Sequence, residues 1–136
     1  QCTAQKLASL VEGTGASQLR LTPWRMLFLE AASPFQTDDF ITEPDDPLLT
    51  VSACSGAPLC PQASVPTRDL ARALAPFHLQ GLHVSGCAKG CALQKASALT
   101  IVGCDGAFDV VRDGRAGDVP VARGLSQDEI RRRFAQ

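Results

Sequence analysis

The sequence lacks a strong excess of charge, a long apolar run and an export signal. Thirteen Lys and Arg against 14 Asp and Glu leave a formal charge of −1, which argues against binding nucleic acid through its phosphates. No apolar run approaches the ~20 residues of a membrane span. The first residues, Gln1 to Ala4, do not begin a secretory signal. We therefore expect a cytoplasmic protein that associates with neither nucleic acid nor a membrane.

The chain also lacks an initiator methionine, and a helical pattern starts almost at once. We expect it to be a piece of a longer protein, cut on its N-terminal side. Its 136 residues, 45% of them apolar, suffice to bury a core without disulfide staples. The six cysteines therefore need another explanation.

The first third of the sequence predicts two helices and two strands. Apolar residues on one helical face predict a helix over residues 4–11. The alternation in residues 18–22 and the apolar stretch 24–29 predict strands. A short helix is expected over residues 33–43.

The middle of the chain predicts a strand–helix–strand unit. Residues 48–53 and 82–85 predict buried strands, and residues 68–75 predict a helix between them, with Thr67 as its N-cap. Two strands joined by such a crossover lie parallel to each other. Their carboxyl ends should therefore meet at the same edge of a sheet.

The last part predicts a hairpin and a helix. Residues 98–103 and 107–112 flank a turn signal, and a further turn is expected at Asp113-Gly114. Residues 126–129 have the pattern of a capping box, which predicts a helix through Phe134. The whole pattern indicates an α+β protein with a mixed sheet flanked by helices.

Four cysteines form two pairs, each following a predicted strand. Cys54 and Cys60 are separated by five residues, and Cys87 and Cys91 by three. Because the two strands should end at one edge of the sheet, the pairs should converge. The residues within each pair are mostly small, which lets backbone N–H groups approach the sulfides of an iron–sulfur cluster. We favour such a cluster as the group that they hold.

Other interpretations of the cysteines stay open. Zinc sites usually use two-residue spacings within a pair, and disulfides need an oxidising compartment. Inert buried cysteines are a third alternative. Cys2 lies at a chain end and Cys104 in a hairpin turn, so neither is assigned as a ligand.

The cysteine pattern resembles that of the nitrite and sulfite reductase superfamily, in which four cysteines hold a four-iron four-sulfur cluster beside a tetrapyrrole. Residues 19–25 are similar to the Arg-Leu-Thr stretch of its ferredoxin-like half-domain. Segments 52–58, 82–92 and 111–116 are most similar to a branch that acts in aerobic cobalamin biosynthesis. Residues 88–89 are Ala-Lys, where sirohaem-binding reductases tend to have Pro-Asn, which favours the same branch. In one departure from the branch, Leu93 and Gln94 replace a common His-Pro.

The resemblance implies a fold and a set of site residues. Residues 1–46 would form part of a ferredoxin-like half-domain, and residues 47–136 a nitrite/sulfite reductase-like iron–sulfur domain that also binds a tetrapyrrole. The two cysteine pairs would be the ligands of the 4Fe-4S cluster. The implied substrate-binding residues, which would contact its carboxylates, are Arg20, Arg25 and Lys89.

The implied activity is that of a monooxygenase, an oxidoreductase that hydroxylates the ring of precorrin-3A with dioxygen and closes a γ-lactone. An additional non-haem iron is compatible with this chemistry, and the electron donor is not identified. The N-terminal half of the same protein would be a further partner, so we expect the isolated piece to be inactive and to self-associate. The alternatives are a sirohaem-dependent nitrite or sulfite reductase, a non-catalytic iron–sulfur electron-transfer module and a disulfide-bonded interaction domain.

Overall fold

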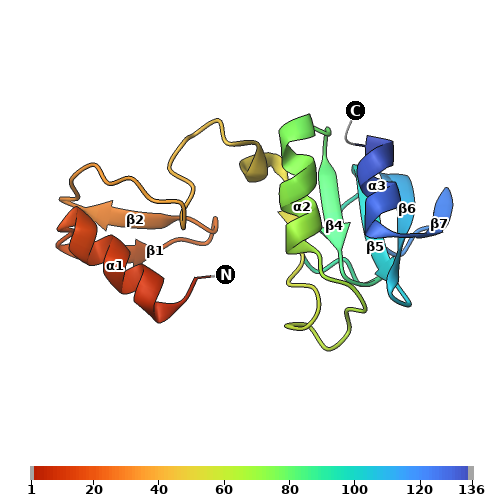
Figure 1. Cartoon of the computed structure of the whole chain (residues 1–136), viewed down its shortest axis with the longest axis horizontal. Helices are drawn as coiled ribbons and strands as arrows, with labels where there is room; N and C mark the ends of the chain where they lie inside the picture. Colours follow the sequence, from red (N-terminus) through yellow and green to blue (C-terminus); the bar gives the residue numbers. More distant parts are fainter. Residues whose placement is uncertain (1, 135–136) are drawn as a thin grey trace. The chain divides into compact units, whose positions relative to one another are not determined.

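The computed structural model describes residues 2–134 and divides into two compact units, with the division between Pro44 and Asp45 (Figure 1). No helix among these residues is long and apolar enough to cross a membrane. The assignment of the first 46 residues to a ferredoxin-like half-domain stays a prediction.

The first unit contains one helix and one hairpin, whose helix and two strands the sequence predicts. Helix α1 (Ala4–Thr14) is followed by strands β1 (Gln18–Leu21) and β2 (Leu27–Glu30), which pair antiparallel. The second strand begins later than residue 24, because residues 22–26 form the turn, in which the Thr22 N–H donates to the Met26 carbonyl at 3.2 Å.

The predicted helix over residues 33–43 is wrong. The segment is irregular, and contacts with α1 hold it in place of helical hydrogen bonds. The Ser33 N–H donates to the Thr14 carbonyl at 2.8 Å, and Asp39 forms an ion pair with Lys6. The ring of Phe35 lies where a Cβ on Gly13 would be, which packs the segment against the end of the helix.

The second unit is built on a mixed five-stranded sheet in the order β3-β4-β5-β6-β7. Strands β3, β4 and β5 run parallel, and β6 and β7 continue the sheet antiparallel. This confirms the predicted α+β class with a mixed sheet, the parallel pair and the hairpin. The strands are β3 (Ser52–Ala53), β4 (Leu82–Ser85), β5 (Ser97–Cys104), β6 (Ala107–Gly114) and β7 (Ala122–Leu125).

Three local predictions in this unit are wrong. Residues 48–50 belong to a 3-10 turn, η1 (Pro47–Thr50), because Asp46 accepts the Leu48 N–H at 2.8 Å and starts a turn there. Thr67 does not cap the following helix with its side chain. Asp113 and Gly114 continue strand β6, so the turn falls after them.

Two helices cover one face of this sheet (Figure 1). Helix α2 (Arg68–Leu74) continues into the 3-10 turn η2 (Ala75–Phe77), and α3 (Gln127–Phe134) closes the unit. Their apolar side chains and alternate residues of the strands form the core. Its fully buried members include Leu70, Leu74, Val84, Ile101, Val110 and Ile130.

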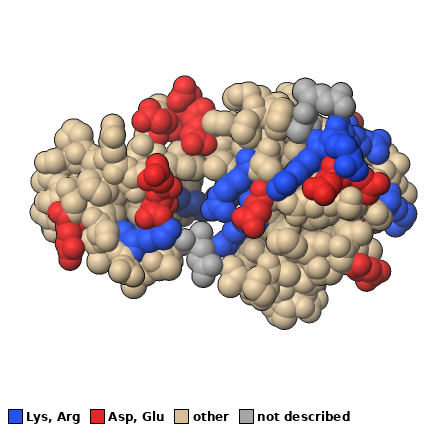
Figure 2. Space-filling model, in the orientation of Figure 1, with Lys and Arg blue, Asp and Glu red and all other residues tan. Residues whose placement is uncertain are grey.

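The predicted capping box starts α3. Ser126 donates its N–H and hydroxyl to one carboxylate oxygen of Glu129, at 2.8 and 2.7 Å, and accepts the Glu129 N–H at 3.2 Å. The last turn contains Arg131, Arg132 and Arg133, and Lys and Arg side chains gather in this region in Figure 2. Positive charge at that end favours the helix, because the helix dipole places partial negative charge there.

Candidate functional site

The two parallel strands β3 and β4 bring the cysteine loops to the same edge of the sheet. Strand β3 pairs with β4 through Ala53 and Val84, so Cys54 follows one strand end and Cys87 lies just beyond the other. The Cys54 N–H donates to the Val84 carbonyl at 3.0 Å, and the Cys54 Sγ lies 3.4 Å from the Ser85 Oγ. The predicted meeting of the strand ends is confirmed.

The first cysteine loop (residues 54–66) touches the second (residues 86–95) through small residues. A Cβ on Gly86 would lie 2.6 Å from the Ala63 Cβ and 3.3 Å from the Gly56 Cα. Only glycine fits at this position, because any larger side chain would push the loops apart. The first loop contains no charged residue and lies in an uncharged, tan region of Figure 2.

Hydrogen bonds within each loop fix its course. In the first loop, the Cys60 N–H donates to the Gly56 carbonyl at 2.8 Å, and the Thr67 hydroxyl donates to the Cys54 carbonyl at 2.7 Å. The Thr67 hydroxyl, which the sequence predicted as the cap of α2, therefore holds the backbone of Cys54 instead. In the second loop, the Ser85 hydroxyl donates to the Cys87 carbonyl at 2.7 Å.

Gln94 closes the second loop on itself. Its side-chain amide donates to the carbonyls of Lys89 and Gly90, at 3.2 and 2.9 Å. The sequence showed Gln94 only as a departure from a family pattern. Its bonds to the loop backbone depend on how the loop folds back, which no residue spacing indicates.

The surroundings of Cys54 lower the pKa of its thiol. Burial raises its pKa, but the neighbouring imidazole of His83, the Ser85 hydroxyl and the backbone groups of Ala92 and Gly86 outweigh burial and lower the pKa from 9.0 to about 6. A lowered pKa favours the thiolate form of Cys54 at neutral pH. A thiolate is the form that binds iron and other soft metals.

The six cysteines are all free. Cys54, Cys60 and Cys87 are half-buried, while Cys91, Cys2 and Cys104 are exposed. Among residues 2–134, no group of three or more His, Cys, Asp or Glu side chains is arranged to hold a metal ion. The donor chemistry and the small residues of the loops fit an iron–sulfur cluster, whose four irons each take one thiolate.

His83 belongs to the site, although its position in a short strand favours a surface or structural role when the sequence alone is considered. The side chain is 0% exposed, and a Cβ on Gly90 of the second loop would lie 3.5 Å from its Cε1. Alternation with Leu82 and Val84 places His83 on the sheet face opposite α2. The sequence does not show that a loop covers this face, so burial could not be predicted.

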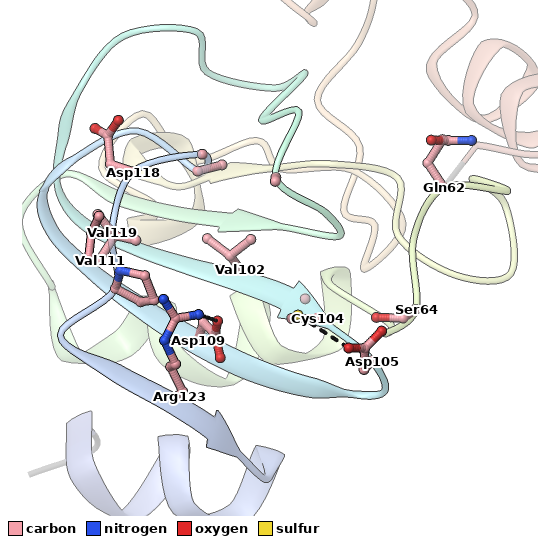
Figure 3. Close-up of a pocket in the computed structure, with 15 residues that line it drawn as sticks. Gln62, Ser64, Val102, Cys104, Asp105, Asp109, Val111, Asp118, Val119 and Arg123 are labelled. Atoms are coloured by element: carbon pink, nitrogen blue, oxygen red, sulfur yellow. Dashed lines mark hydrogen bonds and ion pairs between the residues drawn. The ribbon is translucent and has the colours of Figure 1, made fainter.

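A cavity of about 450 Å³ lies on the same face, and residues of both cysteine loops form part of its wall (Figure 3). Asp105, Asp109 and Asp118 carry negative charge around it, against one guanidinium, that of Arg123. Asp109 accepts the Gly124 N–H at 2.9 Å and lies 3.4 Å from Arg123. An excess of carboxylates makes this cavity unsuited to a substrate with several carboxylates of its own.

The predicted substrate-binding residues lie in different units. Arg20, on β1, forms an ion pair with Glu30, and Arg25 occupies the β1–β2 turn with a φ of 61°. Both are exposed, and both belong to the first unit. Lys89 is exposed in the second cysteine loop. Arg20 and Arg25 thus belong to the first unit and Lys89 to the second.

The second unit is thus an α+β domain whose mixed sheet presents two thiol-bearing loops at one edge. No family model matches the chain. Over 140 aligned residues the chain is 35% identical to a precorrin-3B synthase from a Sinorhizobium species, and the match covers 90% of this chain. The chain spans 30% of the length of that relative. It is therefore similar to a segment of that precorrin-3B synthase, which confirms the resemblance to the cobalamin branch.

Proposed function

We propose that the chain is the cluster-binding, C-terminal part of a precorrin-3B synthase with a nitrite/sulfite reductase-like fold. The observation that carries this proposal is the placement of Cys54 against the second cysteine loop in a chain 35% identical to such an enzyme. Cys54, Cys60, Cys87 and Cys91 hold one 4Fe-4S cluster. The cluster supplies single electrons to the oxygen-dependent conversion of precorrin-3A to precorrin-3B.

The residues of the chain prepare the site for an anionic group. The surroundings of Cys54 lower the pKa of its thiol to about 6, which favours the thiolate, and the Ser85 Oγ lies 3.4 Å from its sulfur. Gly56 and Gly86 leave the backbones of the two loops in close contact, with no side chain between them. Lys89 adds the only positive charge between the paired cysteines, which offsets part of the negative charge of four thiolates.

Arg20 and Arg25 bind carboxylates of the tetrapyrrole in this proposal, and Lys89 approaches the substrate from the cluster side. A planar guanidinium binds a carboxylate through two parallel hydrogen bonds, which suits a substrate with several acidic side chains. For Arg20 this binding replaces its ion pair with Glu30. Hydroxylation of the ring and closure of a γ-lactone follow in the whole protein, in the cytoplasm, with dioxygen as co-substrate.

Substitution of single cysteines tests the ligand set. The chain is purified without oxygen, supplied with iron and sulfide, and analysed for both elements and for visible absorption. The native chain should bind about four irons and four sulfides. Cys54→Ser, Cys60→Ser, Cys87→Ser and Cys91→Ser should each abolish or sharply reduce the absorption band, because each removes one thiolate ligand.

Cys2→Ser and Cys104→Ser are the matched controls, since both thiols are exposed and neither is paired with another cysteine. Both controls should bind the native amount of iron. Loss of the cluster in either control, with retention in Cys60→Ser, would show that the ligand set is wrong.

A further inference from the structure

His83 is a buried imidazole without a hydrogen-bond partner. It is 0% exposed, and neither Nδ1 nor Nε2 makes a hydrogen bond within residues 2–134. Leaving a buried donor unpaired is costly, so such a group usually has a use. Substituting an apolar residue would avoid this cost, yet the chain has histidine here.

The side chains around His83 limit its possible partners. Cys54 is its neighbour, and Gly90, where a Cβ would lie 3.5 Å from the His83 Cε1, offers no side chain. The Ser85 hydroxyl also approaches the Cys54 sulfur, at 3.4 Å, but its one proton is donated to the Cys87 carbonyl at 2.7 Å. The side-chain N–H that remains available to the Cys54 sulfur is that of His83.

We propose that His83 is a positioning residue that donates a ring N–H to the Cys54 Sγ when the cluster is bound, and thereby raises the reduction potential of the cluster. The inference rests on the proposed function, because it requires a cluster at Cys54. An N–H dipole directed at a ligand sulfur stabilises the reduced state, which carries one more negative charge, more than the oxidised state.

The test compares His83→Leu with His83→Gln after anaerobic reconstitution. Leucine fills much of the same space and donates no hydrogen bond, whereas glutamine keeps an N–H donor. Redox titration of the cluster should give a more negative midpoint potential for His83→Leu, and His83→Gln should restore part of the shift. Thr100→Val is the control, because Thr100 is equally buried and pairs with His83 across β4 and β5. It should leave the potential at the native value even if it lowers stability.

Equal potentials in native chain, His83→Leu and Thr100→Val would overturn the inference and leave the cluster proposal intact. A native chain that binds no iron or sulfide would overturn the proposed function, and this inference with it. An equal shift in Thr100→Val would show a general packing effect and would also overturn the inference.

A second measurement uses the native residue at position 83, so it does not depend on the folding of a variant. The chain has two histidines, and the other, His78, is exposed. In His78→Asn chain labelled with ¹⁵N-histidine, any histidine signal in pulsed EPR of the reduced cluster comes from His83. A weak nitrogen coupling supports a hydrogen bond to the ligand sulfur. No coupling, or the strong coupling of a coordinated imidazole, contradicts the inference.

Discussion

Gly86 lies where the two cysteine loops touch, and it gives a prediction that needs no cofactor. A Cβ at this position would lie 2.6 Å from the Ala63 Cβ, which is closer than two carbons can approach. Gly86→Ala should therefore destabilise the second unit by about 1–3 kcal/mol, the usual cost of overpacking a filled interior. Urea unfolding of the metal-free chain measures this change.

The matched control removes the opposing methyl group. Ala63→Gly in the Gly86→Ala background restores the space, so the double variant should recover a large part of the lost stability. If the double variant were no more stable than Gly86→Ala, the contact between the loops would not be the cause of the loss.

For single residues, the sequence predicts which cysteines are candidate ligands better than it predicts which side chains surround them. Cys54 and Cys87 could be placed together because two short strands of a crossover unit must end at one edge of a sheet. His83 could not be recognised, because its burial depends on a loop that folds over the opposite sheet face. Thr67 was recognised as a polar residue with a local hydrogen bond, but its partner is the Cys54 carbonyl across the loop.

The elements of the second unit follow from local signals where those signals are strong. Strand β4, the β5–β6 hairpin and helix α3 match their predictions, because alternation, turn residues and a capping box all indicate the same element. Residues 48–50 were mistaken for strand because their apolar character outweighed the turn signal at Asp46-Pro47. Strand β7 was missed, since its four residues include Arg123 and Gly124 and it is formed by pairing with β6.

The capping box of α3 predicts a pH dependence. Two hydrogen bonds to the carboxylate lower the pKa of Glu129 below its usual 4.5. The Ser126 N–H has the larger effect, and the Ser126 hydroxyl has the smaller one. A carboxyl with a lower pKa in the folded state binds fewer protons than in the unfolded state. Its stabilising contribution is thus complete above pH 4.5 and is lost as the pH falls through the folded-state pKa.

Glu129→Gln keeps a side-chain acceptor for Ser126 and removes the charge. The variant should be less stable than the native chain at pH 7. The difference should shrink as the pH is lowered towards 3, because the native carboxyl takes up a proton as the pH falls through its folded-state pKa. Thermal unfolding at several pH values between these limits measures the difference. A difference that stayed constant over this range would show that ionisation of Glu129 does not contribute.

The two units of the molecule differ in how completely they bury their apolar residues. The second unit has a closed core between its sheet and two helices. In the first unit, apolar side chains of the β1–β2 hairpin remain exposed: Leu21 is 79% exposed, Trp24 70% and Phe28 57%. Large apolar groups gathered on one hairpin mark a surface that pairs with other protein.

We therefore expect the isolated chain to self-associate through this hairpin. Light scattering at rising concentration should give an average mass above the 14.4 kDa of one chain. Replacing Trp24 and Phe28 with Ser should return the mass towards that of a monomer, because the change removes apolar area that association would bury. Val119→Ser is the control, since Val119 is 83% exposed but lies in the second unit, and it should leave the association unchanged. A native chain that stayed monomeric at all concentrations would contradict this prediction, whatever the cysteine loops bind.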